Sequence, residues 1–132
     1  MLQQYKSSNM VVDTSIVIQH IRAKNKFSTT LYNLTEQEII FISTVSMYEL
    51  YIGAHSKDKQ NDVRLSTKKL IVLPFTHSIS VQAAEIFLQL KAKNQLIEFR
   101  DIFIAATCIS HNLPIATLNK KHFERVEGLA IV

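Results

Sequence analysis

The sequence predicts an α/β protein built as a three-layer α/β/α sandwich, in which helices cover both faces of a central, mainly parallel sheet. Three observations lead to this prediction. Short apolar segments alternate with longer amphipathic segments along the chain. The short segments are continuously apolar, which is typical of parallel strands that are buried on both faces. The longer segments between them supply the helical crossovers that parallel strands require.

The composition fits one compact domain. The chain has 132 residues, of which 47% are hydrophobic, with only 2 Gly and 2 Pro. This length can bury a substantial core but leaves no room for a second domain. We therefore expect a single domain over residues 1–132, with residues 1–8 as a flexible N-terminal extension. The 15 Lys and Arg residues exceed the 11 Asp and Glu residues, which favours an anionic partner, either a nucleic acid or an acidic protein.

The cellular compartment can be predicted from the cysteine content and from the hydropathy of the chain. The single Cys108 cannot form a disulfide within the chain, and a reducing cytoplasm is the simplest location for such a protein. The N-terminal segment MLQQYKSS lacks the apolar core of a signal peptide, and no segment approaches the roughly 20 apolar residues of a membrane span. We expect a soluble cytoplasmic protein with no membrane contact.

The first part of the chain predicts two strand–helix pairs. A continuous apolar run makes Met10–Val12 a buried strand, and the segment from Thr14 to about Ala23 has its apolar residues on one side of a helix. A second helix is predicted from about Ser28 to Leu34. The β-rich run Ile39–Ser43 forms the second strand, and a helix follows it over Val45–His55.

The middle of the chain continues the alternation. Residues from about Asp58 to Leu70 are polar and helical, and Leu70–Phe75 is a third strand that Pro74 interrupts. Ser78 is expected to cap a long helix that runs to about Lys93. These elements extend the strand–helix pattern that defines a parallel sheet.

The last part of the chain contains the most apolar helix. The segment NQLIEFR is predicted as a loop that leads to Asp101, and the apolar segment IFIAATCISH then forms a helix. Asn112 and Pro114 turn the chain after this helix. Two short strands are predicted next, over Pro114–Thr117 and over the terminal LAIV.

Three acidic residues stand near the starts of predicted helices. Asp13 follows the first strand, Glu49 lies within about two turns of the start of its helix, and Asp101 begins the apolar helix. Each has a structural explanation as well: Asp13 and Asp101 can cap their helices, with Asp13 accepting from the amide of Ser15 or Ile16. Glu49 has no opposite charge at helical spacing with which to pair. A cap and a functional role can coexist in one carboxylate.

In a parallel sheet these helix starts lie along one edge, outside the carboxyl ends of the strands, where ligands bind. Three converging carboxylates repel one another unless a cation lies among them. Hard oxygen ligands suit Mg²⁺ or Mn²⁺, which can activate a water and stabilise charge on a phosphate. The sequence therefore predicts a Mg²⁺ or Mn²⁺ site at Asp13, Glu49 and Asp101, directed at phosphate chemistry.

Four blocks of this sequence resemble the PIN-domain family, in particular the VapC-type toxins of toxin–antitoxin pairs. The blocks are VVDTSIVI, ISTVSMYELYIGA, DIFIAATCISHNLPIATLNKKHF and the terminal strand after a Gly. The resemblance implies that Asp13, Glu49 and Asp101 are the metal-binding acids of a Mg²⁺-dependent ribonuclease. It further implies a homodimer, with candidate surfaces on residues 47–52 or 28–34, and an antitoxin protein that silences the enzyme.

The sequence departs from the family pattern at one position. Members commonly place a fourth acid after the short strand, where this chain has Asn119. Asn119 can orient the attacking water but adds no charge, which leaves open whether one or two metal ions bind. Glu124 is a further candidate for this role, although its place after Phe123 favours an outward orientation.

Basic and polar residues near the acids are candidates for substrate binding. Ser15 follows Asp13 by two residues, Arg100 precedes Asp101, and Lys120 and Lys121 follow Asn119. Such groups can hold the flanking phosphates of RNA without regard to sequence. The same charges can also be an ordinary solvated surface.

Several other classes of protein are less compatible with the sequence. The five His residues show neither HExxH nor Cys–His spacing, and no phosphate-binding glycine motif is present. A receiver-like regulatory domain would need a paired acid after its first strand and a phosphoacceptor Asp after a middle strand. In this chain Val12 precedes Asp13, and Ser43 ends the second strand. The alternative that stays open is a PIN-fold module that binds RNA or a protein without cleavage, because Asn119 stands where an acid is common.

Overall fold

The computed structural model describes residues 9–132, so the prediction for residues 1–8 concerns residues outside the described range. Within that range the sheet has four parallel strands in the order β3-β2-β1-β4. The strands are β1 (Met10–Val12), β2 (Ile40–Ser43), β3 (Ile71–Leu73) and β4 (Ile115–Ala116). The predicted parallel sheet is confirmed, and its four strands all run in one direction.

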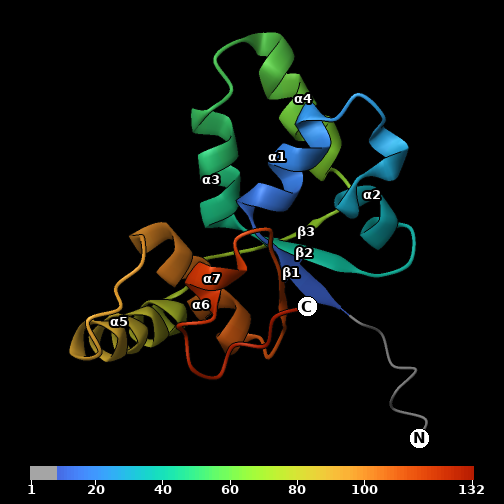
Figure 1. Ribbon diagram of the computed structural model, residues 1–132. Helices are drawn as coiled ribbons and strands as arrows, with labels where there is room; N and C mark the ends of the chain where they lie inside the picture. The colour runs from blue at the N-terminus through green and yellow to red at the C-terminus, as the bar shows by residue number, and fades with distance from the viewer. Residues whose placement is uncertain (1–8) are drawn as a thin grey trace, which may run out of the picture.

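Helices cover both faces of this sheet, as Figure 1 shows. One layer contains α1 (Thr14–Arg22), the 3₁₀ turn η2 (Lys26–Ser28), α2 (Thr30–Thr35), α3 (Thr44–Ile52) and α4 (Lys57–Thr67). The other contains α5 (His77–Ala92), α6 (Phe99–Ser110) and α7 (Lys120–Phe123). The predicted α/β/α sandwich is therefore confirmed.

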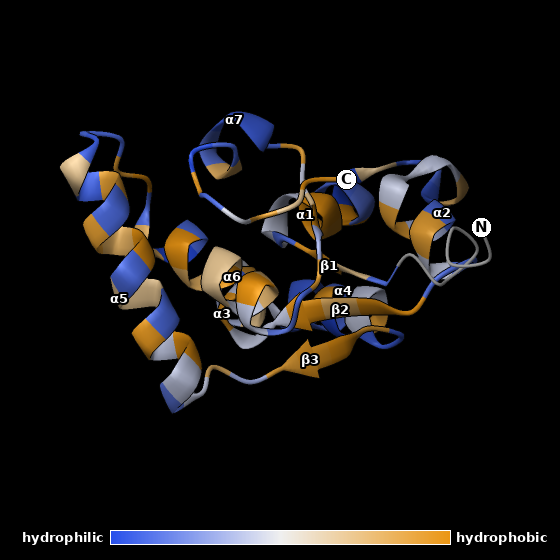
Figure 2. Ribbon diagram, turned by 90° about the horizontal axis from the view of Figure 1, so that it is seen from below, coloured by the Kyte–Doolittle hydropathy of each residue, from blue (hydrophilic) through white to orange (hydrophobic). Residues whose placement is uncertain are grey.

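The two layers have separate cores because successive strand residues point to opposite faces of a sheet. Met10 and Val12 pack into the cluster under α1–α4, whereas Val11 packs into the cluster under α5 and α6. All three are at most 3% exposed. The hydropathy in Figure 2 agrees with this burial: β2 and β3 are hydrophobic along their length, and α5 alternates between polar and apolar residues.

The direction of the strands places several helix starts at one edge of the sheet. β1 leads directly through Asp13 into α1, and β2 leads through Ser43 into α3. Both residues cap their helices, with side-chain oxygens that accept from the amides of Ser15 and Val45. The acids of α1 and α3 therefore reach the same edge, as predicted.

Some predicted boundaries are wrong. Thr76, and not Ser78, caps α5, because its hydroxyl lies 3.3 Å from the amide of Ile79 and Ser78 is already helical. Helix α6 begins at Phe99, so the end of NQLIEFR is helical, and its N-cap residue Glu98 makes no side-chain capping bond. Asp101 thus lies in the first turn of α6 and is not its cap.

The C-terminal region also differs from the prediction. The segment LAIV forms a single parallel bridge between Ile131 and Ile115, and not a full strand. The short helix α7 was not predicted, because four residues are too few to show helical periodicity. In the described part of the chain, no helix combines the length and the apolar character that a bilayer crossing requires.

Candidate functional site

Asp13 is the most deeply buried acid at this edge of the sheet. Only 4% of the residue is exposed. One carboxylate oxygen accepts hydrogen bonds from the Ser15 amide (3.1 Å) and the Ser15 hydroxyl (2.5 Å). The other accepts from the Thr117 hydroxyl at 2.6 Å. The capping role predicted for Asp13 is confirmed. Its second oxygen is held by Thr117, which directly follows β4.

The two hydroxyls that hold Asp13 also organise the loop after β4. Ser15 Oγ accepts from the amide of Leu118 at 3.1 Å, and Thr117 Oγ1 accepts from the amide of Asn119 at 2.9 Å. Each hydroxyl therefore donates to the carboxylate and accepts from the backbone. Asp13 and the segment that carries Asn119 form one connected network.

Glu49 reaches the site from α3. Its Oε1 accepts from the Thr14 hydroxyl at 2.7 Å, and its Oε2 lies 3.3 Å from Nε of Arg100. Arg100 also lies 3.7 Å from the carboxylate of Glu98. Glu49 has no positively charged neighbour on its own helix, but Arg100 of α6 supplies one. A hydroxyl from α1 and a guanidinium from α6 fix its orientation.

Asp101 completes the group from the first turn of α6. Its Oδ2 lies 3.4 Å from Nδ1 of His122, and that nitrogen is 2.9 Å from Nδ2 of Asn119. Both Asp101 and Glu49 keep 18% of their side-chain surface exposed. Asp101 and Glu49 therefore remain partly open to solvent, unlike Asp13.

The electrostatics of the site show that Asp13 and Glu49 both act on Asp101. Burial raises the pKa of Asp101, and the negative charges of Asp13 and Glu49 raise it further, while the hydrogen bond and charge of His122 lower it. Burial also raises the pKa of Asp13, against the hydrogen bonds of Ser15 and Thr117. The charges of Asp13 and Glu49 therefore both reach Asp101.

The donor chemistry fits a hard divalent cation. Carboxylate oxygens are the ligands that Mg²⁺ and Mn²⁺ prefer, and a cation would relieve the repulsion among the three acids. Among residues 9–132, however, no three His, Cys, Asp or Glu side chains lie close enough in their present orientations to hold a metal ion together. Two of the acids instead face basic side chains of the same chain, Arg100 and His122.

The remaining predicted residues lie around this group. Arg100 contacts Glu49 and Ser15 contacts Asp13, whereas Lys120 and Lys121 are exposed on α7 beside Asn119. Glu124 is exposed at the end of α7, as its position after Phe123 indicated.

Sequence reasoning missed three partners of the acids, namely Thr14, Thr117 and His122. Thr14 and Thr117 stand beside predicted strand ends, which was a signal that they lie at this edge. In the sequence, His122 stands only as a further basic residue after Lys120 and Lys121. Its contact with Asp101 depends on α7, which the sequence did not predict.

Neutralising Asp13 is expected to stabilise the metal-free fold. An Asp13→Asn variant keeps the shape of the side chain but removes a charge whose burial is costly, so its free energy of unfolding should rise by roughly 0.5–2 kcal/mol at neutral pH. Because the pKa of Asp13 is raised in the fold, wild-type stability falls as pH rises from the ordinary carboxyl value through the raised pKa. The gain from Asn should therefore vanish in acid, where both side chains are neutral.

Urea unfolding in EDTA at several pH values measures this difference. Asp58→Asn, an exposed change of the same type on α4, should show no comparable gain. A loss of stability in Asp13→Asn at every pH would mean that its hydrogen bonds outweigh the cost of the buried charge.

Comparison with known proteins gives consistent matches over nearly the whole chain. The family model described as PIN domain matches residues 10–129. Ribonuclease VapC1 of Methanocaldococcus jannaschii is 32% identical over 127 residues, which cover 96% of this chain and 87% of that protein. Ribonuclease VapC of Rickettsia bellii is 31% identical over 130 residues, which cover 93% of this chain and 94% of that protein.

Solved structures agree with the fold. DNA-bound VapBC from Salmonella typhimurium matches with a TM-score of 0.80 and 26% identity, over 94% of this chain and 96% of that chain. VapBC2 from Rickettsia felis, bound to a DNA fragment from its promoter, matches with a TM-score of 0.83 and 24% identity, over 94% and 97% of the two chains.

Proposed function

Because this chain belongs to the PIN-domain family, we propose that it is a metal-dependent endoribonuclease and the toxin of a toxin–antitoxin pair. The observation that carries the proposal is the meeting of Asp13, Glu49 and Asp101 at one edge of the sheet. These acids come from three different elements, and the charges of Asp13 and Glu49 both act on Asp101. Relatives named as VapC ribonucleases support the same activity.

In this proposal the three acids hold Mg²⁺ or Mn²⁺. When bound, the cation would supply Lewis-acid chemistry, activating a water and neutralising charge that develops on the phosphate. Asp13 is presented by the hydroxyls of Ser15 and Thr117, and Glu49 by the hydroxyl of Thr14. Such supporting hydrogen bonds fix the direction in which a ligand atom points.

The cationic and amide side chains at the site have roles toward RNA. Arg100, which lies against Glu49, would bind a substrate phosphate at the site, because a guanidinium binds phosphate through several donors. The backbone N–H of Asn119 donates to the Thr117 hydroxyl oxygen. The side chain of Asn119 would help to orient the attacking water. Lys120, Lys121 and Ser15 would contact the flanking backbone.

A second reading is a module that binds RNA or a protein without cutting. It is favoured by Asn119, which adds no charge, and by the contacts of Glu49 and Asp101 with the basic side chains of Arg100 and His122. In that case Arg100 and His122 would stand permanently where a metal ion is needed. The two readings differ in whether RNA is cleaved.

Incubation of the purified chain with single-stranded RNA and Mg²⁺ or Mn²⁺ tests the proposal. We expect cleavage that disappears in EDTA and in Asp13→Asn, with products that carry a 5′-phosphate and a 3′-hydroxyl. Asp58→Asn should cleave at the wild-type rate. Binding without cleavage would favour the module, and cleavage that survives EDTA would contradict a metal-dependent mechanism.

The partners follow from the same proposal. We propose RNA as the substrate, a cognate antitoxin protein as the inhibitor, a homodimer as the assembly and the cytoplasm as the location. VapBC complexes among the similar structures support the antitoxin, and the single buried Cys108 suits a reducing compartment. Exposed apolar side chains on α3 (Tyr48, Tyr51 and Ile52) support one of the predicted dimer surfaces.

A further inference from the structure

A hollow of about 480 Å³ lies next to the acidic site. It is bounded by the segment that leads into α6 and by α7, and its lining residues are Leu96, Ile97, Glu98, Phe99, His122 and Arg125. His122 belongs to both places, because its ring lines the hollow and contacts Asp101. Arg100, adjacent to Phe99 in the chain, contacts Glu49. A ligand in the hollow therefore lies beside the acids.

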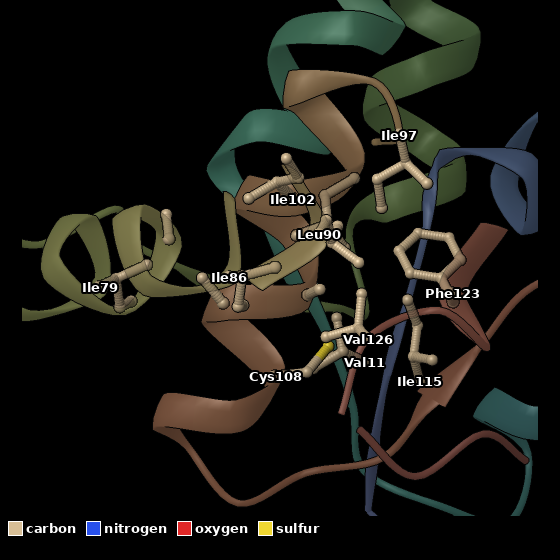
Figure 3. Packing of buried hydrophobic residues seen from close by; sticks show 14 of the residues in the cluster. Val11, Ile79, Ile86, Leu90, Ile97, Ile102, Cys108, Ile115, Phe123 and Val126 are labelled. Carbon is tan, nitrogen blue, oxygen red and sulfur yellow. The ribbon is translucent and has the colours of Figure 1, made fainter. Parts of the chain in front are cut away.

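The walls of the hollow are held in place from within. Ile97 is only 9% exposed and lies beside Phe123 in the core, which Figure 3 shows. The guanidinium of Arg125 donates to the carbonyl oxygens of Leu96 (3.1 Å) and Gln95 (3.5 Å). One apolar and one polar contact thus join the two walls. A preformed hollow costs a ligand little in ordering.

Phe99 is the unusual residue of this hollow. It is 64% exposed, although it stands in the first turn of a helix whose next turns are buried. On one side its ring lies 6.0 Å from the ring of Phe87, at an interplanar angle of 55°. Its exposed surface therefore adjoins the hollow that contains His122 and Arg125.

An exposed aromatic ring beside cationic groups matches the way proteins bind single-stranded nucleic acids. Bases stack on aromatic side chains, while basic groups follow the phosphate backbone. The lining residues include one acid, Glu98, and two basic side chains, His122 and Arg125. We propose that Phe99 is a stacking platform for one RNA base next to the phosphate that is cut, with Arg125 and His122 beside the adjoining backbone.

This inference rests on the proposed function, since it assumes that RNA reaches the acids. It adds to it a preference for unpaired RNA, because a base within a duplex is already stacked on its neighbours and is not free to stack on Phe99. The phenyl ring stacks without regard to base identity. The expected ligand is therefore a single strand with little sequence requirement at this position.

Another occupant has to be separated from RNA by experiment. Phe99 also borders an apolar groove of about 540 Å³ between α5 and α6, whose lining includes Phe75, Phe87, Leu88 and Phe103. A second copy of the chain could cover that groove. His122 and Arg125 line the first hollow and not this groove, and His122 contacts Asp101, which is why RNA is the occupant that we propose.

Binding of a fluorescent RNA single strand in EDTA tests the platform without cleavage. Phe99→Ala is expected to weaken binding about 5- to 150-fold, the equivalent of ~1–3 kcal/mol for a stacked base. Phe99→Tyr should restore the affinity because it keeps the ring. Leu88→Ala is the matched control, since Leu88 is 63% exposed and lines the apolar groove but not the hollow beside the acids; it should bind as the wild type does.

Two further measurements identify the contact. A single strand made only of abasic nucleotides should bind wild type and Phe99→Ala equally, and a duplex should be insensitive to Phe99→Ala. Circular dichroism should show that the variants remain folded. Equal binding of intact single strands by wild type and Phe99→Ala would overturn the proposal.

The remaining outcomes also decide between the possibilities. If Phe99→Ala and Leu88→Ala both lower the sedimenting mass and weaken RNA binding alike, the surface is an interface between copies and the platform is wrong. If RNA is cut in an Asp13-dependent way but Phe99 has no effect on binding, the proposed ribonuclease activity is supported and the stacking role of Phe99 is contradicted. If RNA binds through Phe99 but is never cut, the stacking contact is supported and the proposed cleavage is contradicted.

Discussion

Replacement of Asp101 by asparagine is expected to slow the proposed RNA cleavage by about 10³-fold. The change removes one of the three charges that would hold the cation, and loss of several kcal/mol of transition-state stabilisation corresponds to a reduction of this size. The loss should come without unfolding. Burial and the charges of Asp13 and Glu49 raise the pKa of Asp101, so a neutral side chain relieves repulsion within the fold.

Single-turnover cleavage of a labelled RNA, at saturating Mg²⁺ or Mn²⁺, measures this effect. Titration calorimetry should also show weaker binding of Mn²⁺ to the Asp101→Asn protein, which separates loss of the metal from loss of RNA. Asp58→Asn makes the same charge change on the exposed surface of α4 and should retain full activity. A rate within tenfold of wild type in Asp101→Asn would remove Asp101 from the metal-binding group.

The largest effect on stability is expected from Phe123→Ala. Phe123 is 0% exposed and belongs to the core cluster with Ile97 and Val126, as Figure 3 shows. Truncation of a buried Phe costs about 3–5 kcal/mol, because apolar contacts are lost and a cavity remains. In a chain of this size we expect a fall in melting temperature of roughly 10–20 °C.

Thermal unfolding followed by circular dichroism checks this expectation. Phe27→Ala removes a ring of the same size that is 71% exposed, so it should change the melting temperature only slightly. Phe123→Ala should also weaken RNA cleavage at temperatures where it is folded, since α7 carries His122. An equal and small effect of both variants would mean that the 119–126 region contributes little to the stability of the core.

The sequence was sufficient to predict the sheet and the acids, because both depend on local signals. Continuous apolar runs marked β1 and β2, and polar residues at their ends marked Asp13 and the start of α3. The direction of the strands then brought the acids to one edge. β3 and β4 are shorter than predicted, because an apolar run does not show where hydrogen bonding to a neighbouring strand stops.

The contacts that orient the acids could not be predicted from local sequence patterns. Thr14 and Glu49 lie 35 positions apart, and Asp13 and Thr117 lie 104 positions apart. No periodicity connects such pairs, since their meeting depends on how α1, α3 and β4 pack. The cationic partners of Glu49 and Asp101 are also non-local, and Arg100 could be recognised only as a basic residue near an acid.

The bond between Asp13 and Thr117 has a consequence for the moment at which this protein becomes active during its synthesis. Asp13 leaves the ribosome before Thr117, and the Thr117 hydroxyl that fixes its second oxygen is translated 104 residues later. Until then β1 also lacks β4, its neighbour on one side. A growing chain therefore carries Asp13 without this support until β4 and Thr117 have been translated, so the site is assembled only after both ends of this contact have been made.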